Sequence, residues 1–485
     1  MVSIGGIDTA ILLAYLLGVV ALGLWLGRGQ RDLADYLLGD RNLPWWAVLL
    51  SIVATETSTV TFLSVPGLAF NPEGGNFTFL QLAIGLIVGR FAVIFLLLPQ
   101  YFRGDLFTAY EVLHRRFGGS TRQAASLLFL VTRNLADGLR LYLTAIVLQK
   151  LMGIDLAAAI LVMGMATVLY TVFGGMRSVV WNDCIQFVIY ILGAILAAWV
   201  ILDRLPGGWT QLADFAQQHE KFRLLDFGFD FARPYTFWSG LLGGVFLALA
   251  THGADQMMVQ RYLSAGSCQR AALALGISGF VVAAQFALFL FVGVALACFY
   301  QNYLALPTLP KNDAAFAGFI VEYLPIGITG IVLAAVLAAA MSTLASSLNS
   351  SAAAAVNDFY VGWRKTEPSK RHLLWAGRIL TVVFGLIQIT VAIAGRHLAA
   401  SVVDSVLAIA SFTTGAVLGV FFLGILTRGV PQWAALVGLL GGLGVLTFVA
   451  FGTPIAWPWY ALIGSASTFV LGWTASLLFP SSSKE

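Results

Sequence analysis

The sequence predicts an all-α membrane protein, and two observations carry this prediction. Of the 485 residues, 59% are hydrophobic and only 10% are charged, and the mean hydropathy is +0.88. A soluble domain carries about 25% charged residues. In addition, 13 stretches are apolar over the roughly 20 residues that an α-helix needs to span a bilayer. Such stretches must be helices, because lipid cannot satisfy free backbone polar groups and the stretches are too long for barrel strands.

The expected helices are distributed over the whole chain, which we interpret as one membrane domain of residues 1–485. The first stretch has no basic region before it and no small-residue cleavage site after it, so we expect it to stay as a helix and not to be removed as a signal peptide. In order, the expected helices cover 7–27, 44–69, 77–98, 121–149, 154–173, 178–202, 235–252, 269–299, 326–358, 372–395, 399–425, 431–451 and 457–479.

The distribution of Lys and Arg predicts how these helices are oriented, because basic residues gather in the cytoplasmic loops of membrane proteins. With the N-terminus outside, 16 of the 27 basic residues, Arg261 among them, fall in expected cytoplasmic loops. Only 7 fall in outer loops, and four of these lie in 203–234. We therefore expect a multi-pass protein of the plasma (inner) membrane, with the N-terminus outside and the C-terminus in the cytoplasm.

Several function classes are disfavoured by the motifs that the sequence lacks. There is no GxxxxGK[ST] motif, so we do not expect an ATP-driven pump. The net charge of +4 is small and no basic arm with interleaved aromatic residues occurs, so nucleic acid is not an expected partner. The three cysteines and five histidines are scattered without metal-binding or catalytic spacing, so we do not expect an enzyme.

The second expected helix has a polar interruption near its middle. Residues 55–59 read Thr-Glu-Thr-Ser-Thr, and such side chains weaken a helix because they compete for backbone hydrogen bonds. An unwound turn would expose carbonyl oxygens, which are ligands that a hard cation prefers. The alternative is an intact helix, in which Thr and Ser bond to their own backbone and Glu56 faces a neighbouring helix.

The ninth expected helix carries hydroxyl groups along one face. Ser342 and Ser346 are four residues apart, Thr343 adjoins Ser342, and Ala339 lies about one turn earlier. One interpretation is a cage of hydroxyl and carbonyl oxygens for sodium. The other is a face of small residues that lets two helices pack closely.

Two further helices carry ionisable residues, which are costly in a membrane and are functional candidates by default. In the sixth, Asp183 shares a face with Gln186 and needs a cation, a counter-charge or a proton, unless it is solvated near the helix end. In the fourth, Arg133, Asp137 and Arg140 are spaced to neutralise one another. Their summed charge of +1 would leave one Arg for a substrate carboxylate or for the acidic residue of the second helix.

These residues lie in motifs that resemble the sodium/solute symporter family, which includes sodium-coupled sugar, proline, pantothenate, sialic acid and monocarboxylate transporters. The resemblance extends from about residue 8 to 450, and its most specific marks are the GGMRS stretch and the Ser-rich ninth helix. The motifs are DYLLGDRNLPWW (35–46), ATETSTVTFLSVPG (54–67), YTVFGGMRSVVWNDCIQ (170–186), HGADQMMVQRYLSA (252–265) and MSTLASSLNSSAAAAVNDFY (341–360).

The resemblance implies a LeuT-like core of two inverted five-helix repeats. The first repeat would cover 44–202 and the second 235–425, with a leading helix at 7–27 and two trailing helices in 431–479. It also implies that sodium is the coupling ion and that a small solute is the other ligand.

By the same resemblance, the broken first core helix and the eighth core helix would hold one sodium. Some members resemble a two-sodium design that adds Asp183 and Ser346, and Ala345 departs from that design, which has a hydroxyl there. The ligands of the first sodium would be the carbonyl groups of Ala54, Thr57 and Ala339 and the hydroxyl groups of Ser342 and Thr343.

The solute would lie against the broken helix and the helices that face it. We expect sodium-coupled symport of a small polar solute by alternating access. A proton-coupled transporter or a uniporter on the same fold is the alternative, with Asp183 and Glu56 as proton carriers. The residues expected to contact the solute are Glu56, Ser58, Thr61, Phe77, Gln81, Arg133, Arg140, Thr413 and Thr414.

Overall fold

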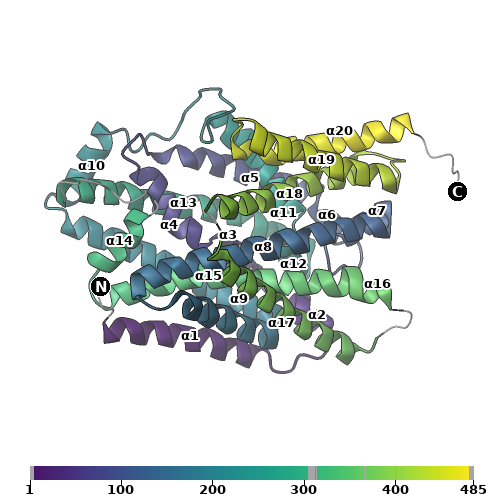
Figure 1. Cartoon of the computed structure of the whole chain (residues 1–485), viewed down its shortest axis with the longest axis horizontal. Coiled ribbons are helices and arrows are strands. Elements are labelled where there is room, and N and C mark those ends of the chain that lie inside the picture. The colour runs from purple at the N-terminus through teal and green to yellow at the C-terminus, as the bar shows by residue number, and fades with distance from the viewer. Residues whose placement is uncertain (1–4, 304–311, 313, 365–367, 399, 480–485) are drawn as a thin grey trace.

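The computed structural model describes residues 5–303, 312, 314–364, 368–398 and 400–479. Within this part every regular element is a helix, and the long helices run side by side as one bundle (Figure 1). Helix α1 begins at the end of the bundle where α10 and α14 lie, and α20 ends at the other end, where α7 and α16 lie (Figure 1).

Helices occupy both halves of the chain. The first half contains α1 (Gly6–Leu26), α2 (Leu33–Leu38), α3 (Trp45–Glu56), α4 (Thr59–Phe70), α5 (Leu80–Leu96), α6 (Leu98–Tyr101), α7 (Glu111–Phe117), α8 (Gly119–Met152), α9 (Leu156–Arg204) and α10 (Gly208–Gln218). The second half contains α11 (Gly244–Gly253), α12 (Gln256–Ser264), α13 (Cys268–Tyr303), α14 (Ala314–Glu322), α15 (Ile328–Ala354), α16 (Val361–Trp363), α17 (Lys370–Gly395), α18 (Ala400–Leu426), α19 (Gln432–Gly452) and α20 (Tyr460–Leu478). Short 3-10 turns are η1 (Gly39–Arg41), η2 (Phe77–Phe79) and η5 (Trp457–Trp459), and π-helical turns are η3 (Ser239–Gly243) and η4 (Ala355–Tyr360).

The expected number of 13 spanning helices is not confirmed. In the described residues, nine helices are long and apolar enough to span a bilayer, or ten if the bent pair α3–α4 is one span. Three differences explain the gap. The expected helices 154–173 and 178–202 are the two helical stretches of α9, which meet at the non-helical residue Gly175 and are counted as one span. Helix α8 is not counted as a span, because it carries five charged residues. The expected helix 235–252 is not counted either, because it is a shorter apolar helix, Ser239–Gly253.

The polar interruption in the second expected helix is a real break, and α3 and α4 meet there at 66°. Thr57 and Ser58 both have extended backbone conformations. Thr57 closes α3, because its hydroxyl donates to the carbonyl of Val53 (2.9 Å). Ser58 opens α4 as its N-cap, with its hydroxyl accepting from the backbone N–H of Thr61 (3.3 Å). The intact-helix alternative is therefore wrong.

Helix α9 changes direction at Gly175, inside the GGMRS stretch. Gly175 has φ 56° and ψ −152°, and a Cβ atom added there would lie 2.4 Å from the carbonyl oxygen of Tyr36. Both the positive φ and the close approach require glycine.

Helix α15 forms the centre of the bundle and positions the candidate site. It is the most deeply buried of the apolar helices, with 89% of its most apolar stretch inside the structure. Its many Ala and Ser residues allow close approach of neighbouring helices, as where Gly193 of α9 faces Ala335. Any polar atom of α15 therefore faces protein or a cavity inside the protein.

The loop after α10 is held to the end of α4 by hydrogen bonds. The ammonium group of Lys221 donates to the carbonyl oxygens of Ala69 (3.1 Å) and Asn71 (2.8 Å), and burial lowers the pKa of Lys221 to about 8. Close by, the backbone N–H of Gly228 and the guanidinium of Arg233 lower the pKa of Asp226.

Candidate functional site

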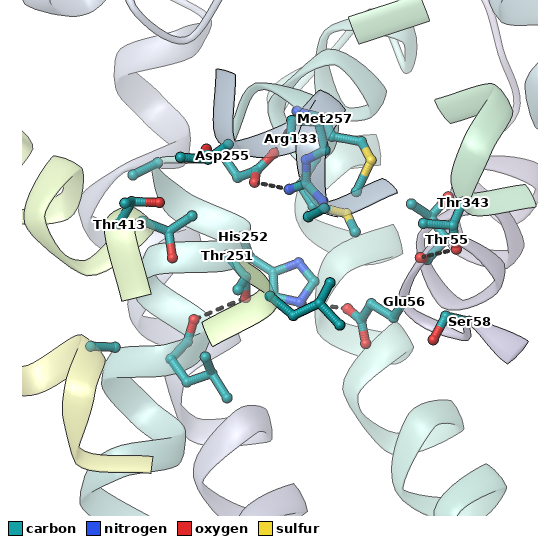
Figure 2. Close-up of a pocket in the computed structure, with 18 of the residues that line it drawn as sticks. Thr55, Glu56, Ser58, Arg133, Thr251, His252, Asp255, Met257, Thr343 and Thr413 are labelled. Carbon is teal, nitrogen blue, oxygen red and sulfur yellow. Dashed lines mark hydrogen bonds and ion pairs between the residues drawn. The ribbon is translucent and has the colours of Figure 1, made fainter. Parts of the chain in front are cut away.

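A cavity of about 610 Å³ lies beside the break between α3 and α4. Its lining comes from both sides of the break and from α5, α8, α11, α12, α15, α18 and α20. This volume is within the range of about 300–1,000 Å³ that is typical of small-molecule sites. Most of its lining is apolar, with a few polar and charged groups that converge on it (Figure 2).

One wall of the cavity is a network around Glu56. Its carboxylate accepts from Arg90 of α5 at 2.5 and 2.6 Å, and Nε2 of His252 lies 2.5 Å from Oε1 of Glu56. Figure 2 shows His252 and Glu56 facing each other at the cavity. Nδ1 of His252 lies 3.2 Å from the hydroxyl of Tyr262. The negative charge of Glu56 is thus balanced within the protein, by a guanidinium whose side chain is fully buried.

A second set of ion pairs also lines the cavity. Arg133 of α8 pairs with Asp255, at the start of α12 (Figure 2). Arg140 pairs with Asp137 at 2.6 Å, and Arg133 lies 3.9 Å from the same carboxylate. The expectation that Arg133 or Arg140 stays free or pairs with Glu56 is therefore wrong, because α12 supplies a second carboxylate.

Of the expected ligands of the first sodium, Thr343 lies where the end of α3 meets α15. The hydroxyl of Thr343 donates to the carbonyl oxygen of Thr55 (3.2 Å) and lies 3.4 Å from that of Ala339 (Figure 2). Ala54 and Ser342 are fully buried beside them. The hydroxyl of Thr57 accepts from Gln285 (2.7 Å). Neutral carbonyl and hydroxyl oxygens from two helices are thus gathered at this point, a donor set that suits a hard cation.

The carboxylate of Asp183 lies in a neighbouring cluster and is not solvated. Its two oxygens accept from the hydroxyls of Ser342 (2.6 Å) and Ser51 (2.5 Å). Arg261 of α12 completes an ion pair with it at 3.2 Å and also donates to Ser346. The expected cytoplasmic-loop position of Arg261 is wrong, because only 1% of its side chain is exposed.

The cavity brings together most of the residues expected to bind the solute. As the structure describes it, Phe77 and Gln81 are not part of its lining. Gln81 is buried elsewhere, where it accepts from the backbone N–H of Asp226 (2.9 Å), and Phe77 packs on Phe222. The expected residues that do line the cavity are Glu56, Ser58, Thr61, Arg133, Arg140, Thr413 and Thr414.

Arg90, His252, Asp255 and Arg261 carry or can carry a charge at the site and are not among the expected site residues. Three of them lie within the HGADQMMVQRYLSA motif, which carries the resemblance without an assigned role. Arg90 interrupts an otherwise apolar helix, and a charge in such a place is a signal that sequence reasoning could have used.

Comparison with known proteins agrees with this architecture. A family model described as the sodium:solute symporter family matches residues 36–442. The human sodium/iodide cotransporter is 31% identical over 470 residues, which cover 93% of this chain and 71% of that protein. The sodium/sialic acid symporter NanT of Aliivibrio fischeri is 29% identical, over 98% of this chain and 94% of its own length. A solved structure of a Na⁺-coupled sialic acid symporter in a substrate-bound, outward-open state has a TM-score of 0.90 and 28% identity, with 98% of both chains covered.

Proposed function

The chain belongs to the sodium:solute symporter family, with sodium as its coupling ion, and on this premise we propose that it imports a small polar organic solute with sodium by alternating access. The solute would be a sugar or polyol, a monocarboxylate, an amino acid or a similar molecule. It would bind in the cavity beside the break between α3 and α4. Sodium would bind the carbonyls of Ala54, Thr57 and Ala339 and the hydroxyls of Ser342 and Thr343.

The observation that carries this proposal is that the two binding regions share residues. Thr55 and Thr343 line the solute cavity, and the carbonyl of Thr55 and the hydroxyl of Thr343 are bonded at the sodium region. A cation there would hold the end of α3 against α15 and so complete the wall that the solute contacts. Because binding free energies are reciprocal, the solute should in turn tighten sodium.

The membrane potential then drives uptake. Each sodium that moves down 100 mV supplies about 2.3 kcal/mol, in addition to its concentration term. When the bundle rocks to the inward state, the sodium region opens to the cytoplasm and both ligands leave.

The proposed orientation has the N-terminus outside and the C-terminus in the cytoplasm. The start of α1 and the end of α20 lie at opposite ends of the bundle (Figure 1). The end of the bundle at which α20 ends also contains α7, whose last turn includes Arg115 and Arg116. This placement of basic residues supports a cytoplasmic location for that end.

A proton-coupled transporter is the second candidate function, and the contact between His252 and Glu56 favours it. A histidine that touches a carboxylate at a cavity wall can exchange a proton as conditions change on the two sides. In that case, solute uptake would follow the pH gradient and would be indifferent to sodium.

A thermal-shift screen of the purified full chain in detergent tests the proposal. Sugars, polyols, amino acids, monocarboxylates and sialic acids would each be offered in sodium and in potassium. A ligand that binds only the native state raises its stability by about 2.7 kcal/mol at 100 times its Kd. We expect at least one solute to stabilise the protein in sodium but not in potassium. If the stabilising solutes act equally in both salts and follow pH, the sodium assignment falls and the second candidate replaces it.

A further inference from the structure

Arg378 of α17 is a cation for which the described part of the chain supplies no carboxylate. Its Nη2 donates to Oε1 of Gln30 (3.0 Å), and its guanidinium lies 6.0 Å from the ring centre of Tyr36 and 5.6 Å from that of Trp375. Its Nε is buried and has no hydrogen-bond partner among the described residues. Most N–H donors of this guanidinium are therefore not used by the protein.

Other arginines within the helices of the bundle are balanced in a different way. Each of them pairs with a carboxylate of the protein, as seen for Arg90, Arg133, Arg140 and Arg261. A positive charge beside lipid is costly without a counter-charge. The described residues do not provide one for Arg378, so this side chain can take an anion from outside the protein.

The surroundings of Arg378 are positively charged. Gln30 joins three segments there, because its Oε1 accepts from Arg378 and its Nε2 donates to the carbonyl of Gly174 (2.8 Å). Seven basic and three acidic residues occur in these segments, which are 27–41, 174–178 and 368–378. An anion bound at Arg378 would thus lie in a field of positive charge.

The acidic residues of these segments are engaged with other groups. Asp32 accepts from the backbone N–H of Asp35 (3.1 Å), and Asp35 accepts from that of Arg31 (2.9 Å). The side chain of Asp40 is 65% exposed and lies 4.0 Å from Arg177. None of these carboxylates neutralises Arg378.

Arg378 lies near one end of the bundle. Helix α17 begins at Lys370, so Arg378 is about two turns from its start. Trp375 and Trp25, in the last turn of α1, are 51% and 61% exposed, and exposed indole rings are typical of the membrane–water interface. Helix α16, which precedes α17 in the chain, lies at the end of the bundle where α20 ends (Figure 1). The proposed orientation places this end in the cytoplasm, and the lipid leaflet on that side carries anionic headgroups.

We propose that Arg378 binds the phosphate of an anionic phospholipid, whose headgroup lies between the loop after α1 and the first turns of α17. A guanidinium suits this role, because its parallel N–H groups match two phosphate oxygens. A zwitterionic lipid offers the same phosphate but brings its own cation into a positive field, so it binds less well. The bound lipid ties α17 to the loop after α1. This site is independent of the solute and of sodium.

The experiment measures thermal stabilisation of the purified full chain in detergent by added lipid. Short-chain phosphatidylglycerol is titrated against phosphatidylcholine of the same chain length. We expect phosphatidylglycerol to raise the melting temperature with a half-saturating concentration about tenfold lower than that of phosphatidylcholine. Equal curves for the two lipids would overturn the inference. Inorganic phosphate is titrated in parallel, and if it stabilises the protein as well as phosphatidylglycerol does, the site takes a free anion and the lipid assignment falls.

Two variants test whether Arg378 itself makes the site. In Arg378→Gln we expect the half-saturating concentration of phosphatidylglycerol to rise about tenfold, because one charge-assisted contact is lost. Arg371→Gln is the matched control, since Arg371 is an exposed arginine at the start of the same helix, and its loss should change that concentration by about twofold or less. Unchanged binding in Arg378→Gln, or equal losses in both variants, would overturn the inference. If Arg378→Gln does not fold, the comparison of the two lipids on the wild type decides.

Discussion

Thr343 and Ser346 lie one turn apart on α15 and face the same end of α3, yet their surroundings differ. Thr343 meets the neutral carbonyls of Thr55 and Ala339, whereas Ser346 meets the guanidinium of Arg261. Thr55 takes part in both, with its carbonyl on one side and its hydroxyl on the other. The comparison teaches that the sequence shows a row of hydroxyls on one helix, whereas residues far away in the sequence supply the groups that each hydroxyl contacts.

The largest effect is expected from breaking the buried ion pair of Asp183 and Arg261. Asp183→Ala leaves the guanidinium of Arg261 buried without its counter-charge, and breaking a buried pair in this way costs about 3–5 kcal/mol. The apparent melting temperature in detergent should fall accordingly. The control is Asp183→Leu combined with Arg261→Met, which removes both charges and should lose clearly less. If the double variant is as unstable as the single one, the two residues do not act as a pair.

The next effect is expected in the sodium dependence of solute binding, at the proposed sodium ligands Ser342 and Thr343. Combining Ser342→Ala with Thr343→Ala removes two of the five proposed ligands, and we expect the half-saturating sodium concentration for solute binding to rise at least tenfold, or about 1.4 kcal/mol. Ser350→Ala, another buried hydroxyl of α15 that bonds to its own backbone, is the matched control. An unchanged sodium dependence in the double variant would remove Ser342 and Thr343 from the proposed site.

A smaller effect, on solute affinity, is expected where the break between α3 and α4 faces the cavity. Thr61 lines the cavity, and Thr61→Val removes its hydroxyl while keeping its shape. Loss of one hydrogen bond of about 1 kcal/mol would weaken solute affinity about fivefold. Thr59→Val is the control, because Thr59 is buried two residues away and its hydroxyl donates to the carbonyl of Val336 (3.1 Å). Equal losses in both variants would mean that the change acts through the shape of α4 and not through contact with the solute.

The parts of this molecule that sequence can predict are those governed by local chemistry. The break at Thr57 and Ser58 is predictable, because adjacent polar side chains compete with the helix in which they lie. The boundary inside α9 is predictable as well, because the sequence separates two expected helices at 174–177 and the backbone of Gly175 is not helical.

Pairing between helices cannot be predicted in the same way. Arg261 belongs to Asp183, 78 residues away, and Arg133 to Asp255, 122 residues away. The sequence shows that such charges exist, but helix packing selects their partners. For this reason the expectation of a free Arg133 is wrong, and so is the loop position expected for Arg261, which lies in the core.

The smallest effect concerns Lys221, which binds the loop after α10 to the end of α4. Its pKa is about 8 in the folded protein and has its ordinary, higher value in the unfolded chain. Between these two values the unfolded state binds more protons, so the contribution of Lys221 to stability increases as pH rises above about 8. Lys221→Met cannot titrate, and the difference in melting temperature between wild type and variant should therefore shift in favour of the wild type from pH 7 to pH 9.5. Parallel pH profiles would show that this lysine is not desolvated. The loop would then be held to α4 by a hydrated charge, unlike the buried charges around Asp183.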